Sequence, residues 1–139
     1  MVKTETLEIP TRGNCDIVDI TGTVQQAVAQ SGLTNGTVTV FNVGSTAGVT
    51  TIEYEPGLVQ HDINAAFEKI APQAGRYEHE ETWHDDNGHA HVRATLLGPS
   101  LVVPFCEQNL TLGTWQQIVL VDFDTRPRTR RVICQMIGE

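Results

Sequence analysis

The segment Gln116–Phe123 reads QQIVLVDF and is apolar at nearly every position from Ile118 onward. Successive side chains of a strand point to opposite faces, so such a run predicts a strand that is buried on both sides. We expect this strand to span residues 115–123 and to be central. The segment Thr37–Val43, TVTVFNV, has apolar residues of mixed parity and predicts a second central strand.

Other elements are predicted outward from this core. Alternating residues predict strands at 3–9 and 15–20, joined by a hairpin across Thr11–Asn14, and extended segments at 49–53, 110–112 and 131–137. The alternation at 89–97 predicts a strand whose hairpin partner is 101–105. Apolar periodicity predicts helices at Thr21–Ser31 and Leu58–Ile70. The expected fold is α+β, with about eight or nine mostly antiparallel strands in a sheet or open barrel and two helices packed on one side.

Length and composition bound the class of protein. The chain has 139 residues, which predicts a single domain over 1–139. The net charge of −8 argues against a nucleic-acid partner, although Arg126–Arg131 is a basic run. We interpret that run as a solvated strand end, with a ligand site as the alternative. No apolar stretch approaches 18 residues, so no membrane span is expected.

The N-terminal residues and the cysteines indicate the cellular compartment. The N-terminal residues lack an apolar segment of the kind found in signal peptides. Cys15, Cys106 and Cys134 are far apart and odd in number, which indicates reduced thiols. We therefore expect a cytoplasmic protein.

The segment Tyr77–Arg93, YEHEETWHDDNGHAHVR, holds four of the five histidines. These are His79, His84, His89 and His91. Clustered imidazoles suggest metal or proton chemistry, and the alternative is a solvated acidic loop. If 89–97 is a strand, His89, His91 and Arg93 share one face.

Small residues follow the predicted strand 37–43. In Gly44–Gly48, GSTAG, the backbone amides and the hydroxyls of Ser45 and Thr46 could approach an anion. A plain loop is the alternative. Trp115 is interpreted as a core or interface aromatic, or else as a stacking platform for a substrate ring.

Several motifs together resemble a known family. They are GSTAGVTTIEYEPG (44–57), YEH with GHAHVRATLLGPSLVVP (77–79 and 88–104), LGTWQQIVLVDFDTRPRTRR (112–131) and the final GE. Over about residues 36–139 the chain is similar to the YjbQ-type family, described as secondary thiamine-phosphate synthases. The resemblance implies an α+β subunit in a homotrimer, with a histidine site at the subunit interface that holds a divalent metal. The implied reaction joins a pyrimidine pyrophosphate to a thiazole phosphate and releases pyrophosphate.

The family's motif positions fall on residues of this chain. Its YxH histidine falls on His79, the later histidine on His91 and the basic residue two further on Arg93. Its glutamate and its helix aspartate fall on Glu53 and Asp62. Most members carry a histidine at Gly44 and an asparagine at Ile52.

These residues give a working hypothesis for the site. A zinc ion is held by His89 and His91 with His84 or His79, which leaves an open coordination position. Arg93 binds a substrate phosphate.

The remaining candidates have supporting roles. Ser45 and Thr46 add hydrogen-bond donors, and Asp62 or Glu53 orients a ring or acts as base. The alternatives are a metal-assisted hydrolase or lyase on a phosphorylated metabolite, and a non-enzymatic trimer that binds a metal or an anion.

Overall fold

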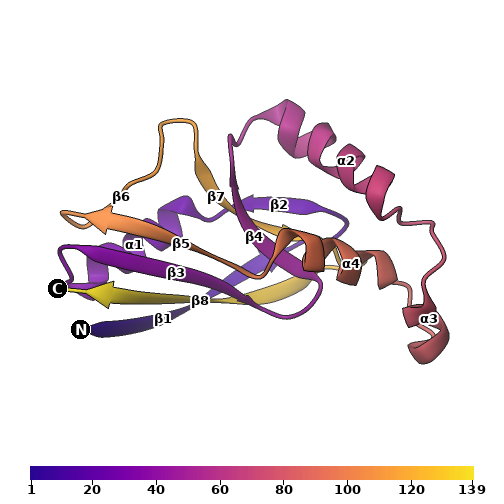
Figure 1. Cartoon of the computed structure of the whole chain (residues 1–139), viewed down its shortest axis with the longest axis horizontal. Helices are drawn as coiled ribbons and strands as arrows, with labels where there is room; N and C mark the ends of the chain where they lie inside the picture. The colour runs from indigo at the N-terminus through magenta and orange to yellow at the C-terminus, as the bar shows by residue number, and fades with distance from the viewer.

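Two antiparallel β-sheets form the body of the computed structural model, which describes residues 1–139 (Figure 1). The five-stranded sheet has the order β1-β8-β3-β5-β6, and the three-stranded sheet has the order β2-β7-β4. The first sheet contains β1 (Val2–Thr11), β3 (Gly36–Val43), β5 (Ser100–Cys106), β6 (Asn109–Leu110) and β8 (Arg128–Gly138). The second contains β2 (Asp16–Asp19), β4 (Ala47–Ile52) and β7 (Gln117–Asp122). The predicted α+β class is confirmed.

Four α-helices accompany the sheets, together with one π-helical turn. They are α1 (Thr21–Ser31), η1 (Leu58–Asp62), α2 (Ile63–Ile70), α3 (Glu78–Trp83) and α4 (Gly88–Leu97). The predicted helix 58–70 is found as η1 followed by α2. None of the helices is long and apolar enough to cross a membrane.

Strand β7 separates two hydrophobic cores, which explains its continuous apolar run. Ile118 and Leu120 face the larger core, which lies between the two sheets and also contains α1. Val119 and Val121 face a smaller core beneath α2 and α4. Because both faces of β7 are covered, no position between Ile118 and Asp122 is left to solvent. The prediction of a buried central strand is confirmed.

The predicted hairpin across Thr11–Asn14 is wrong. Strand β1 pairs with β8, whereas β2 pairs with β7 in the other sheet. Gly13, Asn14 and Cys15 all have positive φ angles, and this turn redirects the chain from one sheet to the other. A Cβ on Gly13 would lie 2.7 Å from the Asp124 carbonyl oxygen, so only glycine fits there.

The predicted strand 89–97 is also wrong, because these residues form α4. Buried positions follow a helical pattern, with Ala90 and Ala94 four residues apart against the smaller core. Their small side chains let the helix approach β7, which a short polar–apolar alternation does not reveal. The proposed hairpin partner of this segment instead pairs with β3. A further helix, α3, lies within the predicted histidine-rich loop.

Candidate functional site

The helical form of α4 separates the candidate histidines. In a helix, residues four apart share a face, so His89 and Arg93 point the same way. Residues two apart lie about 200° apart around the axis, which turns His91 away from both. His89 and Arg93 are buried, and His91 is partly exposed. The predicted common face of His89, His91 and Arg93 is therefore incorrect.

His79 on α3 and His91 on α4 lie together. Their ring centroids are 4.3 Å apart, and the rings are tilted by 52°. Burial and then the neighbouring His79 hold the pKa of His91 below its ordinary value, although Asp124 and the Ser45 carbonyl oppose this. Nε2 of His79 lies 3.2 Å from Oδ1 of Asn87, the residue before α4. The chain thus brings two imidazoles to one place.

A buried polar network continues from this pair to the end of β7. The Thr46 hydroxyl donates to Oδ2 of Asp124 at 2.8 Å, and Asn87 also bonds this carboxylate. Burial alone would raise the pKa of Asp124. Hydrogen bonds from Thr46, the Thr125 amide and Asn87, with the charge of Arg128, outweigh it and lower that pKa. Asp124 is therefore a fixed anion about which the network is arranged.

Arg130 on β8 joins the same network. Its Nε donates to Oδ2 of Asp122 at 2.7 Å, and its Nη2 donates to Oδ1 of Asp122 at 2.8 Å and to the Thr46 hydroxyl at 2.7 Å. Arg130 and Asp122 are both buried. The interpretation of 126–131 as a solvated strand end is therefore wrong for Arg130.

Asn87, Asp122 and Asp124 were not singled out from the sequence, and Arg130 was noted only as part of the basic run 126–131. One signal for them was present. In Asp122-Phe123-Asp124 and Arg128-Thr129-Arg130, like charges alternate, and opposite charges on neighbouring segments can pair.

Arg93 makes its contacts elsewhere. Its Nε donates to the Ala71 carbonyl at 2.9 Å, Nη1 to Oδ1 of Asn64 at 3.0 Å and Nη2 to Oε1 of Glu68 at 2.6 Å. The side chain is 3% exposed. All three guanidinium nitrogens bind within the chain and the side chain is almost fully buried, so Arg93 fastens α4 to α2 and does not point its guanidinium into an open site.

His89 lies beside Arg93 and away from His91. Its residue exposure is 1%, and its Nδ1 has no hydrogen-bond partner. Burial, and then the charge of Arg93, lowers the pKa of His89. This geometry keeps the ring neutral in a packed position and does not bring it to the His79–His91 pair.

The remaining predicted residues are spread over other parts of the surface. His84 ends α3 and lines a hollow of about 450 Å³ with Asp85, Asp86, Thr125 and Arg126. Thr46 and Glu53 flank opposite ends of β4, which at about 3.3 Å per residue separates them by roughly 20 Å. Asp62 is exposed and bonds the adjacent His61. Of the predicted residues, the structure gathers His79, His91, Ser45 and Thr46.

Comparisons with known proteins agree with this fold. A family model described as "UPF0047 protein YjbQ-like" matches residues 5–139. The chain belongs to the YjbQ-like UPF0047 family. A UPF0047 protein of Archaeoglobus fulgidus is 40% identical over 131 residues, which cover 94% of this chain and 98% of that protein. YugU of Bacillus subtilis is 33% identical, with 96% and 98% covered.

Solved structures extend the similarity to three dimensions. A YbjQ-like protein of Sulfolobus solfataricus P2 matches with a TM-score of 0.89 at 35% identity, over 100% of both chains. A hypothetical protein of Aeropyrum pernix K1 matches with a TM-score of 0.90 at 33% identity, over 99% of both chains.

A single YjbQ-like chain does not supply the ligands expected for zinc. A catalytic zinc takes three protein ligands, commonly His, Cys, Asp or Glu. His79 and His91 are two, and no group of three or more such side chains in the chain is arranged to hold a metal ion. The predicted set of His89 and His91 with His84 or His79 is not assembled, because α4 points its histidines in opposite directions.

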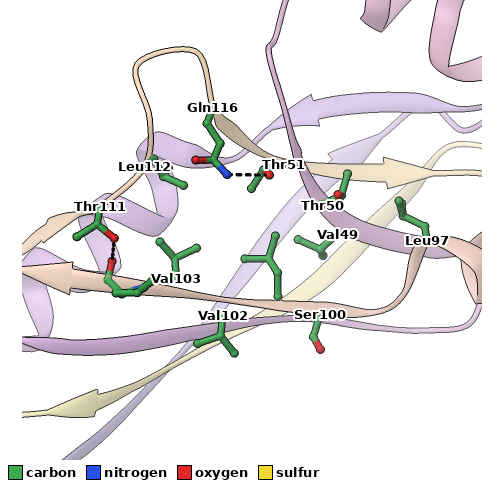
Figure 2. A pocket seen from close by; sticks show the side chains of 12 residues that line it. Val49, Thr50, Thr51, Leu97, Ser100, Val102, Val103, Thr111, Leu112 and Gln116 are labelled. Carbon is green, nitrogen blue, oxygen red and sulfur yellow. Dashed lines mark hydrogen bonds between the residues drawn. The ribbon is translucent and has the colours of Figure 1, made fainter.

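A separate groove of about 350 Å³ lies between β4, an edge strand of its sheet, and β5 (Figure 2). Val49, Leu97 and Leu112 contribute apolar walls, and Gln116 donates to the Thr51 hydroxyl at 3.1 Å across one end. No charged or titratable side chain lines this groove. It offers contact surface and no acid, base or charge.

Proposed function

We propose that this chain is a phosphate-directed transferase with secondary thiamine-phosphate synthase activity. In that reaction a pyrimidine pyrophosphate is joined to a thiazole phosphate, and pyrophosphate is released. Membership of the YjbQ-like family supports the proposal. The observation that carries it is the 4.3 Å pair of His79 and His91 beside the Ser45–Thr46 loop.

The chemical task of such a site is to accept the departing pyrophosphate. When the bond from carbon to the pyrophosphate oxygen breaks, negative charge accumulates on the leaving group. Two adjacent imidazoles favour sharing one proton over binding two, since a second charge would repel the first. Without a metal ion, the protonated ring can donate to the leaving oxygen, whereas a zinc ion held by the two rings would stabilise the charge on that oxygen instead. The Ser45 hydroxyl, which is exposed, can donate to another oxygen.

A homotrimer and a metal ion are part of the proposal. A zinc ion at His79 and His91 needs a third ligand, and in a homotrimer a neighbouring copy would have to provide it. The mass of the protein in solution, with elemental analysis of the assembled oligomer, tests both points. A monomer without bound metal would contradict both the trimer and the metal ion. The chemistry proposed for the side chains alone would then be tested by the turnover assay.

A second candidate is hydrolysis or elimination on a phosphorylated metabolite. The observation that favours it is the lowered pKa of His91, because a neutral imidazole at neutral pH can take a proton from water. Turnover of phosphorylated compounds without a thiazole acceptor would favour this reaction over the transferase.

The transferase is tested by incubating the purified protein with the two substrates and measuring thiamine phosphate and pyrophosphate by chromatography. We expect His91→Ala to remove nearly all product formation. His61→Ala is the matched control, since it removes an exposed imidazole on η1. Absence of product with the unmodified protein, or full turnover by His91→Ala, would refute the assignment.

A further inference from the structure

One nitrogen of the buried Arg130 guanidinium is left without a partner. Nε and Nη2 bind Asp122 and Thr46, whereas Nη1 makes no hydrogen bond within the chain. The side chain is 7% exposed and is held in one position by its two contacts to Asp122. A fixed guanidinium with a spare NH2 group can bind an acceptor with little loss of side-chain entropy.

Gly44 leaves the approach to this nitrogen open. A Cβ built on Gly44 would lie 3.1 Å from Nη1 of Arg130 and 3.7 Å from Nδ2 of Asn42, and no other atom lies within 4 Å of it. Gly44 is exposed and has a φ of +139°, in the region that favours glycine. The missing side chain at Gly44 therefore leaves this side of Nη1 of Arg130 uncovered.

Asn42 provides the second nitrogen near Gly44. It is fully buried, and its Nδ2 makes only long contacts of 3.4 and 3.3 Å to the carbonyls of Gly44 and Ala47. Its Oδ1 has no partner. Both N–H groups of Asn42 are thus taken up by backbone carbonyls, which leaves Nη1 of Arg130 as the free donor. Nη1 carries N–H groups and accepts nothing, so the space it borders suits a hydrogen-bond acceptor.

We propose that this space is a phosphoryl-binding subsite, in which an oxygen of the substrate's phosphate passes the bare Cα of Gly44 and accepts from Nη1 of Arg130. A hollow of about 200 Å³ lined by Gly44, Ser45, Ala47, Ala94, Thr95 and Pro99 adjoins it and can receive the rest of the group. The subsite rests on the proposed function, because it names where a phosphate of that substrate binds.

Two nearby carboxylates affect how strongly Arg130 can attract a phosphate oxygen. Asp122 binds the Nε and Nη2 edge of Arg130, and Oδ2 of Asp124 lies 3.9 Å from Nη2. These charges offset much of the positive charge of Arg130, so the subsite relies on a directed, charge-assisted hydrogen bond more than on net attraction. Placement of the oxygen at Nη1 is then decisive, and a small obstruction there should suffice to block binding.

Gly44→Ala supplies that obstruction. Binding of inorganic phosphate, pyrophosphate and acetate to EDTA-treated protein is measured by isothermal titration calorimetry. Gly32→Ala is the matched control, because Gly32 also has a positive φ, at +75°, but has open space around it and ends α1. Both variants introduce backbone strain, and only one obstructs Arg130.

We expect the unmodified protein and Gly32→Ala to bind phosphate and pyrophosphate alike, and Gly44→Ala to bind them at least about tenfold more weakly. Equal binding by Gly44→Ala, no binding by the unmodified protein, or acetate bound as tightly as phosphate would overturn the proposal. If Gly44→Ala does not fold, a second experiment tests the subsite. Phosphate is titrated into the unmodified protein, and the NMR signals of the arginine side chains are followed. An unshifted Arg130 signal then refutes the subsite.

These outcomes are separable from those of the proposed reaction. Phosphate binding that depends on Gly44, without product formation, would refute the transferase and leave the subsite. Product formation with phosphate binding insensitive to Gly44→Ala would refute the subsite and leave the transferase.

Discussion

The carboxylate of Asp122 and the guanidinium of Arg130 form a two-point ion pair, at 2.7 and 2.8 Å, that is buried between β7 and β8. The Thr11 hydroxyl also donates to Asp122, at 2.6 Å. The pair therefore connects β7 of the three-stranded sheet to β1 and β8 of the five-stranded sheet. It also fixes the position of Thr46, and through it that of Asp124.

Asp122→Ala should destabilise the protein strongly. Removing one partner leaves a buried, uncompensated guanidinium, which typically costs about 3–5 kcal/mol. Chemical unfolding measures the change. The control is Glu81→Gln, which removes an exposed partner of Arg76 and should cost less than about 1 kcal/mol. Similar losses for the two variants would contradict a structural role for the Asp122–Arg130 pair.

Arg93→Ala should reduce stability by roughly 2–4 kcal/mol, because the Ala71 carbonyl and Asn64 lose their buried donor. Glu68→Gln should cost much less, since the Glu68 side chain is 42% exposed. Turnover of Arg93→Ala, assayed well below its melting temperature, should remain near that of the unmodified protein. Loss of turnover in a stable Arg93→Ala protein would instead support the phosphate contact expected from the sequence.

The central strands and the first helix were predictable because their patterns are long. Val24 and Val28 repeat at helical spacing, and the run from Ile118 to Val121 has no polar position. Residues 89–96 alternate only because small alanines fall between larger residues, and a helix that packs closely on a sheet needs the same alanines. Local pattern could not separate these two causes.

The sequence indicated the His79–His91 pair and the Ser45–Thr46 loop, but not the buried network that joins them. His79 and His91 are twelve residues apart in the same histidine-rich segment, so the sequence alone pointed to both. Thr46 and Asp124 are 78 residues apart, and their hydrogen bond follows from the register of β4 on β7. The predicted common face of His91 and Arg93 was wrong because it depended on residues 89–97 forming a strand, whereas they form α4.

The cysteines should differ in reactivity. Burial raises the pKa of Cys15 to about 11 and that of Cys134 to about 12, so neither forms much thiolate at pH 8. Cys106 is exposed. A thiol titration with a disulfide reagent should find about one reactive thiol in native protein and three after denaturation. Cys106→Ser should abolish the native signal, and a second fast thiol would show that the packing around Cys15 or Cys134 opens readily.

His89 should make stability fall on acidification. Burial and Arg93 lower its pKa in the folded state, whereas the unfolded chain has an ordinary pKa of about 6.5. Between these two pKa values the unfolded state binds more protons, so the free energy of unfolding decreases as the pH falls below about 6.5. The contribution of one such group is at most about 1.4 kcal/mol per pH unit. His91 shifts in the same direction and adds to the slope.

The measurement is chemical unfolding of the full chain at several pH values from 7.5 to 5. His89→Gln should flatten the slope, because the buried titrating group is gone. His61→Gln is the control, since His61 is exposed, and it should leave the slope unchanged. Retention of the full slope in His89→Gln would mean that the ring is protonated in the folded protein, where Glu68 and Glu80 would then have to stabilise its charge.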